Sequence, residues 1–221
     1  LSEKVVSAFN FEKIDKYVIA KAGIVSGDDR KFIRDWYEIS YSKISFNESV
    51  FNGKASESYV PICRGGMIRN YFGNYQHIIN INNIWDEDKT TKSVRRGDPK
   101  FYFKTAISWS YISGSGIFGF RICENAVFAT ASPSFFLTDD SYFNSLLGFL
   151  NSKLAGEIIK SLNPTVNLPT GYVESLPFLA DKIKNNSMAN SLVDHQVELS
   201  KKDWNSYESS WDFEQSPLLN E

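Results

Sequence analysis

The sequence has few of the residues that build most catalytic and metal centres. It contains two cysteines and two histidines in 221 residues. Cys63 and Cys123 show no spacing typical of a disulfide framework or a metal site, so a reducing, cytoplasmic location is the default expectation. His77 and His195 have neither a neighbouring nucleophile nor metal-ligand spacing. We therefore expect no metal site and no catalytic centre in this chain.

Long apolar runs and positive charge in excess are also missing. No run approaches the ~20 residues that span a bilayer. No secretory signal is visible at the start, where residues 1–4 resemble a cut into a longer chain. The net charge of −2 by itself argues against a nucleic-acid binder. However, residues 54–121 hold ten Lys/Arg against five Asp/Glu, whereas residues 181–221 hold four against eight. A basic middle and an acidic tail are indicated, although a solvated surface can give the same pattern.

Aromatic residues are abundant, with 17 Phe and 11 Tyr against 2 Met. This composition favours strands, because aromatic side chains suit half-buried pleated surfaces. Residues 58–63 predict an edge strand, since Pro61 cannot donate to a ladder. Further strands are predicted at 77–84, 101–104, 107–112, 118–123 and 126–131. Together they predict an α+β fold with an irregular, mostly antiparallel sheet and flanking helices.

Residues 146–162 carry apolar side chains at the spacing of an amphipathic helix. Asn163-Pro164 stops this helix, because the residue before a proline avoids the α region. A short return to Phe178 then closes a main domain, predicted as residues 1–179. Residues 180–221 are predicted as an acidic helical extension, with helices over 181–198 and from Ser200. Its large apolar residues need a surface to pack on.

One segment imitates a cofactor motif. Gly114 to Gly119 fits the GxGxxG pattern, but a dinucleotide site needs a helix after it, and here strands follow. We interpret these glycines as turns and expect no cofactor in this chain.

Two segments have the composition of a phosphate or base contact. Residues 23–29 form a glycine-punctuated loop before a helix predicted at 30–37, with Asp28 or Asp29 as its N-cap. This is either a capped surface helix or a phosphate site lined by Arg and Lys. Residues 64–74, RGGMIRNYFGN, combine glycines that allow close backbone approach with Arg and Asn, which recognise guanine and adenine edges. An ordinary hairpin turn is the alternative.

The ordered set of motifs resembles the TaqI-like target-recognition (specificity) domain at the C-terminal end of bacterial adenine-specific DNA methyltransferases, in restriction-modification and BREX-type phage-defence systems. Nearly the whole chain takes part. The similar segments are 23–38 (GIVSGDDRKFIRDWYE), 61–74 (PICRGGMIRNYFGN), 99–113, 146–167, 173–178 (VESLPF) and the tail 200–219.

The resemblance implies a non-catalytic module that recognises double-stranded DNA for a methyltransferase domain N-terminal to it in the same chain. S-adenosylmethionine would bind that other domain, and further restriction or defence subunits are expected partners. The expected contacts to the DNA backbone are Arg30, Lys31 and Arg34, and those to the backbone or base edges are Arg64, Arg69, Asn70, Tyr71 and Asn74. Lys104, Ser108 and Arg121 are added as basic or polar positions in the strand region. Alternatives are half of a type I restriction specificity subunit, or a protein-interaction or scaffold domain.

Overall fold

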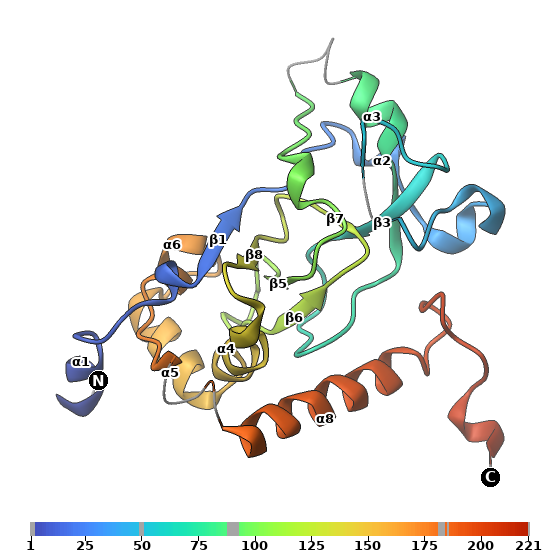
Figure 1. Cartoon of the computed structure of the whole chain (residues 1–221). Coiled ribbons are helices and arrows are strands. Elements are labelled where there is room, and N and C mark those ends of the chain that lie inside the picture. Colours follow the sequence, from blue (N-terminus) through green and yellow to red (C-terminus); the bar gives the residue numbers. More distant parts are fainter. Residues whose placement is uncertain (1–2, 49–50, 88–92, 181–183, 185, 221) are drawn as a thin grey trace.

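The computed structural model describes residues 3–48, 51–87, 93–180, 184 and 186–220. Its strands form two four-stranded sheets, so the predicted α+β class is confirmed. The strands are β1 (Val18–Lys21), β2 (Ile33–Asp35), β3 (Tyr59–Cys63), β4 (His77–Asn80), β5 (Ala106–Trp109), β6 (Phe120–Cys123), β7 (Val127–Phe128) and β8 (Ser134–Leu137). The α-helices are α1 (Glu3–Ala8), α2 (Asp29–Phe32), α3 (Ile81–Glu87), α4 (Phe143–Leu150), α5 (Lys153–Leu162), α6 (Thr170–Glu174) and α8 (Ser187–Trp204) (Figure 1).

The first sheet has the order β1-β8-β5-β6, and all its neighbours are antiparallel. One face of this sheet carries the side chains of Trp109, Phe120 and Phe135. They pack with residues of α4, α5 and α6 in one hydrophobic cluster. Ala106 and Phe136 belong to a second cluster, shared with the other sheet. Because both faces are covered, all four residues of β5 are buried.

The second sheet has the order β2-β4-β3-β7, with only the β3–β7 pair parallel. The predicted edge strand is therefore wrong, because β3 lies between two neighbours. Pro61 fits this interior place because β7 pairs only with Ile62 and Cys63, beyond the proline. The strand predicted at 101–104 is also wrong: Pro99–Phe101 is a 3-10 helix, and Phe103 has a φ of 63°.

The helix predicted at 30–37 is only one turn long. Asp28 caps it as expected, with its Oδ1 accepting from the Lys31 N–H at 3.2 Å. The chain then becomes β2, in which Ile33 is 8% exposed and pairs with Ile79 of β4. Pairing and burial of a β-branched residue outweigh the helical spacing seen in the sequence.

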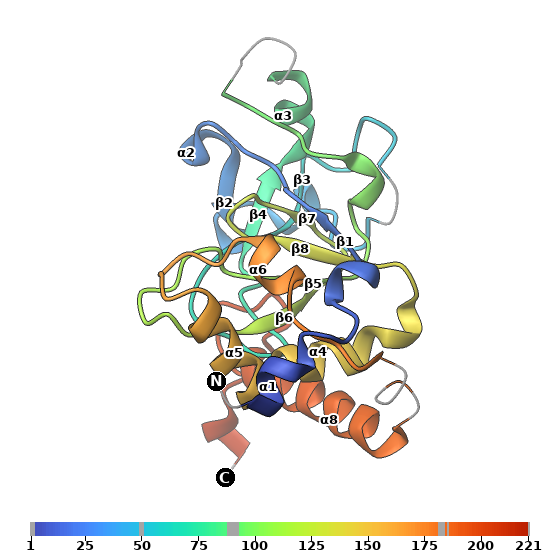
Figure 2. The ribbon, with the colours of Figure 1, turned by 90° about the vertical axis from the view of Figure 1, so that its left-hand side faces the viewer.

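The helix predicted at 146–162 is two helices. Ser152 separates α4 from α5, and its Oγ accepts from the Ala155 N–H at 3.2 Å as an N-cap. α5 ends at Leu162, so the predicted stop at Asn163-Pro164 is confirmed. α8 runs without a break past Ser200, and the predicted new helix start there is wrong. Figure 2 shows segment 163–169 beside the 112–118 loop, where Ile112 pairs with Asn167.

Candidate nucleic-acid interface

The loop 64–74, between β3 and β4, is attached to both sheets. Gly66 accepts from and donates to Ser110 Oγ, at 3.2 Å and 3.0 Å. Tyr71 donates its N–H to the Phe120 carbonyl at 2.8 Å and accepts from the Ile122 N–H at 2.9 Å, so the loop adds to the edge of β6. The loop is therefore held in one shape by the Ser110 side chain, next to β5, and by the backbone of β6.

Several side chains of this loop are used inside the protein. Asn74 donates from Nδ2 to the Met67 carbonyl at 2.9 Å and closes the loop on itself. Arg69 Nη1 binds Asp203 of α8 at 2.7 Å. Burial raises the pKa of Tyr71 above its ordinary value. What the loop presents to solvent is Asn70 and the apolar tip, where Met67 is 77% exposed.

The surroundings of Gly119 explain why one position of the GxGxxG-like motif is a glycine. A Cβ at this position would collide with the carbonyl oxygen of Arg69. The glycine thus lets the loop 64–74 lie directly against the start of β6. The interpretation of this glycine as a turn residue misses that packing role.

α2 lies beside the same loop. Arg64 Nη2 is 2.5 Å from Asp29 Oδ2, and this ion pair joins the loop to the helix. Arg30 and Lys31 are exposed on α2, with the Lys31 Nζ 4.8 Å from the Phe32 ring centroid. Arg34, already in β2, donates to the carbonyl of Ile33 at 2.7 Å. The structure thus brings four of the predicted residues together on three adjoining elements, the loop, α2 and β2.

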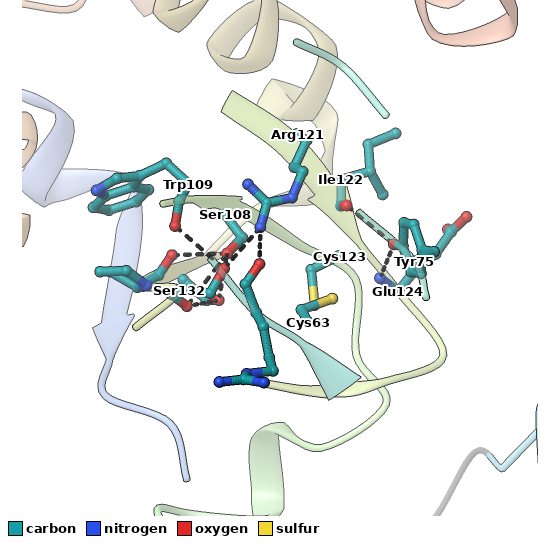
Figure 3. The surroundings of a disulfide bond; sticks show 12 residues. Cys63, Tyr75, Ser108, Trp109, Arg121, Ile122, Cys123, Glu124 and Ser132 are labelled. Atoms are coloured by element: carbon teal, nitrogen blue, oxygen red, sulfur yellow. Dashed lines mark hydrogen bonds between the residues drawn. A yellow bond between two sulfur atoms is a disulfide. The ribbon is translucent and has the colours of Figure 1, made fainter. Parts of the chain in front are cut away.

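Two of the predicted contacts are buried. Ser108 is 0% exposed, and its Oγ lies 2.7 Å from Ser132 Oγ and 2.9 Å from the Pro133 carbonyl. Arg121 is 2% exposed and donates from Nη2 to Ser132 Oγ at 3.1 Å and to the Arg64 carbonyl (Figure 3). Arg121 supports the loop from inside through the Arg64 carbonyl, and neither side chain reaches the surface.

The Arg121 guanidinium is not fully satisfied. Its Nη1 is buried and has no hydrogen-bond partner within the described residues. Burial lowers the pKa of Arg121 to about 10, since a charged group is disfavoured in a low-dielectric interior.

Lys104 is exposed and lies elsewhere. Its Nζ is 5.6 Å from the ring centroid of Phe101, a residue that follows α3 in the chain. Lys104 is therefore not part of the loop 64–74. The residues that sequence reasoning missed are Ser110, Ser132 and Asp203, which fix the loop. These polar residues lie far from the loop in the sequence, and no local sequence pattern indicates that they contact it.

A disulfide stands at the base of the loop. Cys63 and Cys123 are bonded, with their Cα atoms 6.1 Å apart, and they join β3 to β6 (Figure 3). The sequence predicted no such pairing, so this expectation is corrected. A cytoplasmic location stays a prediction, and a permanent disulfide is uncommon in that compartment.

Other site types find no support in the described part of the chain. No cluster of three or more His, Cys, Asp or Glu side chains is arranged to hold a metal ion there. No described helix has both the length and the apolar character that a membrane crossing requires.

Comparison with known proteins then adds to the geometry. No protein-family model matches the sequence. The chain is 30% identical over 215 residues to the adenine-specific methyltransferase PglX of Lacticaseibacillus casei (strain Zhang). The aligned residues make up 94% of this chain and 18% of the relative. It is similar to one segment of a methyltransferase. The adenine-specific methyltransferase BrxX of Escherichia coli O9:H4 (strain HS) is 31% identical over 190 residues, 85% of this chain and 15% of that protein. The chain thus spans less than a fifth of the relatives' length.

Proposed function

We propose that this chain is the duplex-DNA recognition module of an adenine-specific DNA methyltransferase of a restriction or BREX-type defence system. The observation that carries the proposal is the similarity, over 94% of the chain, to a segment of a protein named an adenine-specific methyltransferase. The fold of the module would be TaqI-like. S-adenosylmethionine and the target-base pocket would belong to a catalytic domain in the same polypeptide.

Base chemistry explains why such an enzyme needs this module. An adenine inside a duplex must be extruded before its amino group can react, so the enzyme has to hold the flanking DNA. Phosphate contacts fix the position of the protein, and base-edge contacts give the sequence preference. A rigid loop with an exposed tip, next to exposed cationic side chains, suits this division of tasks.

The buried positions refine the proposed contacts. Arg30 and Lys31 are exposed and are proposed to bind phosphates, with Asn70 at the loop surface as a candidate for base edges. Arg64, Arg69 and Asn74 are partly used in internal contacts. We assign Ser108 and Arg121 a supporting role, because neither can reach DNA without rearrangement of the first sheet.

A segment exchange tests the proposal. The matching segment of the Lacticaseibacillus casei relative is replaced by this chain, and methylated adenines are mapped across the genome of the host cell. We expect a methylated motif that differs from the motif of the unaltered relative. Reinsertion of the relative's own segment through the same junctions is the control. A chimera that keeps the relative's motif would refute recognition by this segment.

Salt dependence tests the phosphate contacts. A fluorescein-labelled duplex of mixed sequence is titrated with the chain at increasing salt. Replacement of Arg30 and Lys31 by Gln should lower the slope of log affinity against log salt by roughly 2, since each phosphate contact contributes about 0.9. The exposed Lys13 and Lys43, also changed to Gln, form the matched control and should leave the slope nearly unchanged. Equal slopes in both double variants would contradict the assignment to α2.

A further inference from the structure

The end of α8 and the residues that follow it contact Arg69 of the loop 64–74. Asp203 binds the Arg69 Nη1 at 2.7 Å. The guanidinium carbon also lies 5.4 Å from the ring centroid of Trp204 and 5.7 Å from that of Tyr207. One arginine is thus oriented by a carboxylate and two aromatic faces, which together restrict its rotamers.

The packing extends over the rest of the loop. The Lys201 Nζ lies 5.5 Å from the ring centroid of Phe72. Gly73, at a φ of 131°, fits between the two elements, since a Cβ there would lie 3.1 Å from Arg69 Cγ and 3.3 Å from the Trp204 ring. Figure 1 shows α8 passing beneath α4, which it contacts. α8 therefore packs against the loop as well as against α4.

The chain that follows α8 is fixed to the body as well. Trp36 donates from Nε1 to the Ser209 carbonyl at 3.0 Å. Trp211 packs edge-on against Tyr75, with ring centroids 5.7 Å apart. Trp204 is 4% exposed and Ser210 is 2% exposed. Removing this segment would expose these side chains, so it is a permanent part of the structure rather than a detachable cover.

Arg69 keeps the capacity to bind a ligand. Within the described residues its hydrogen bond uses only Nη1, and its side chain is 25% exposed. A guanidinium has a second edge with further N–H donors, and these can donate to phosphate oxygens or to acceptor atoms on a base edge. The contact with Asp203 fixes the direction in which that edge points.

We propose that Asp203, with Trp204 behind it, is a positioning residue that holds Arg69 ready to bind duplex DNA. This inference rests on the proposed function. It gives the acidic C-terminal segment a positive role in binding a polyanion, although its charge alone would repel one. Repulsion and positioning predict opposite effects when the Asp203 charge is removed.

The experiment compares Asp203→Asn with Glu198→Gln, which removes an exposed acid from the same helix. The 221-residue chain is titrated against a fluorescein-labelled duplex of mixed sequence and against duplexes selected from a randomised library. We expect Asp203→Asn to weaken binding of the selected duplexes about tenfold, the effect of one charge-assisted contact. Glu198→Gln should leave binding unchanged or slightly tighter. Asp203→Glu should restore most of the affinity.

An exchanged pair separates positioning from a role in stability. Arg69→Asp combined with Asp203→Arg restores an ion pair, and hence any stability that the pair provides, but leaves no cation at position 69 of the loop. We expect melting temperatures near that of the wild type and duplex binding that stays weak. Recovery of binding in this variant would overturn the proposal.

The remaining outcomes are also decisive. Tighter binding by Asp203→Asn would mean that the acidic segment competes with DNA, and affinity equal to that of Glu198→Gln would mean that Asp203 does not position Arg69. Either result overturns the inference. If the wild-type chain selects no duplex from the library, and the segment exchange leaves the methylated motif unchanged, the proposed function itself fails.

Discussion

The disulfide between Cys63 and Cys123 predicts a large effect of reduction on stability. The two residues are 60 positions apart and connect the two sheets. In the chain-entropy model, closing a loop of that length lowers the entropy of the unfolded state enough to stabilise the fold by about 4 kcal/mol, and native disulfides generally contribute about 2–4 kcal/mol. With a urea m value of about 2–3 kcal/mol/M, reduction should lower the unfolding midpoint by roughly 1–2 M.

The assay is urea unfolding followed by tryptophan fluorescence, with and without a phosphine reductant. Both cysteines are almost completely buried, so reduction is carried out in denaturant before refolding. A Cys63→Ala, Cys123→Ala variant is the control and should unfold at one midpoint in both conditions. Equal midpoints of the wild type with and without reductant would refute the reasoning, and two thiols titrating in denaturant without reductant would show that the disulfide is absent.

Three further predictions concern the sheets. Phe135 is fully buried with its ring 4.8 Å from that of Trp109, so Phe135→Ala should cost about 3–5 kcal/mol in urea unfolding, and a loss under 1 would contradict this packing. Trp109→Phe leaves the Leu168 carbonyl without its 2.9 Å donor and should cost about 1–3 kcal/mol by the same assay. Burial lowers the pKa of His77, so folding favours the neutral imidazole, and the unfolding free energy should fall as the pH drops below about 6.5, the ordinary value. His77→Gln should flatten that decline.

Local signals in the sequence predict local structure well. The stop at Asn163 and the cap at Asp28 are both present, because each depends on neighbouring residues alone. Ile33 illustrates the limit: its spacing suits a helix, but its partner Ile79 lies in a strand 46 positions further on. A local sequence pattern around Ile33 contains no information about that pairing.

The candidate interface shows the same limit. Arg121 has the residue type of a DNA contact, yet it is buried between two sheets beside Ser132. Arg69 and Asp203 are separated by 134 positions, so their ion pair cannot be deduced from charge patterns. The sequence identifies the loop 64–74 as unusual, but only the fold shows which of its side chains remain available to a ligand.

The double attachment of this loop has a practical consequence for engineering. Ser110 holds the backbone at Gly66, and Tyr71 rejoins β6 before the chain enters β4. Residues 67–70 therefore form a short cassette with fixed ends. Libraries randomised at Met67, Ile68 and Asn70, with Arg69 retained, should keep the fold while they vary the exposed surface. New DNA preferences could then be sought by exchanging these few positions rather than a whole domain.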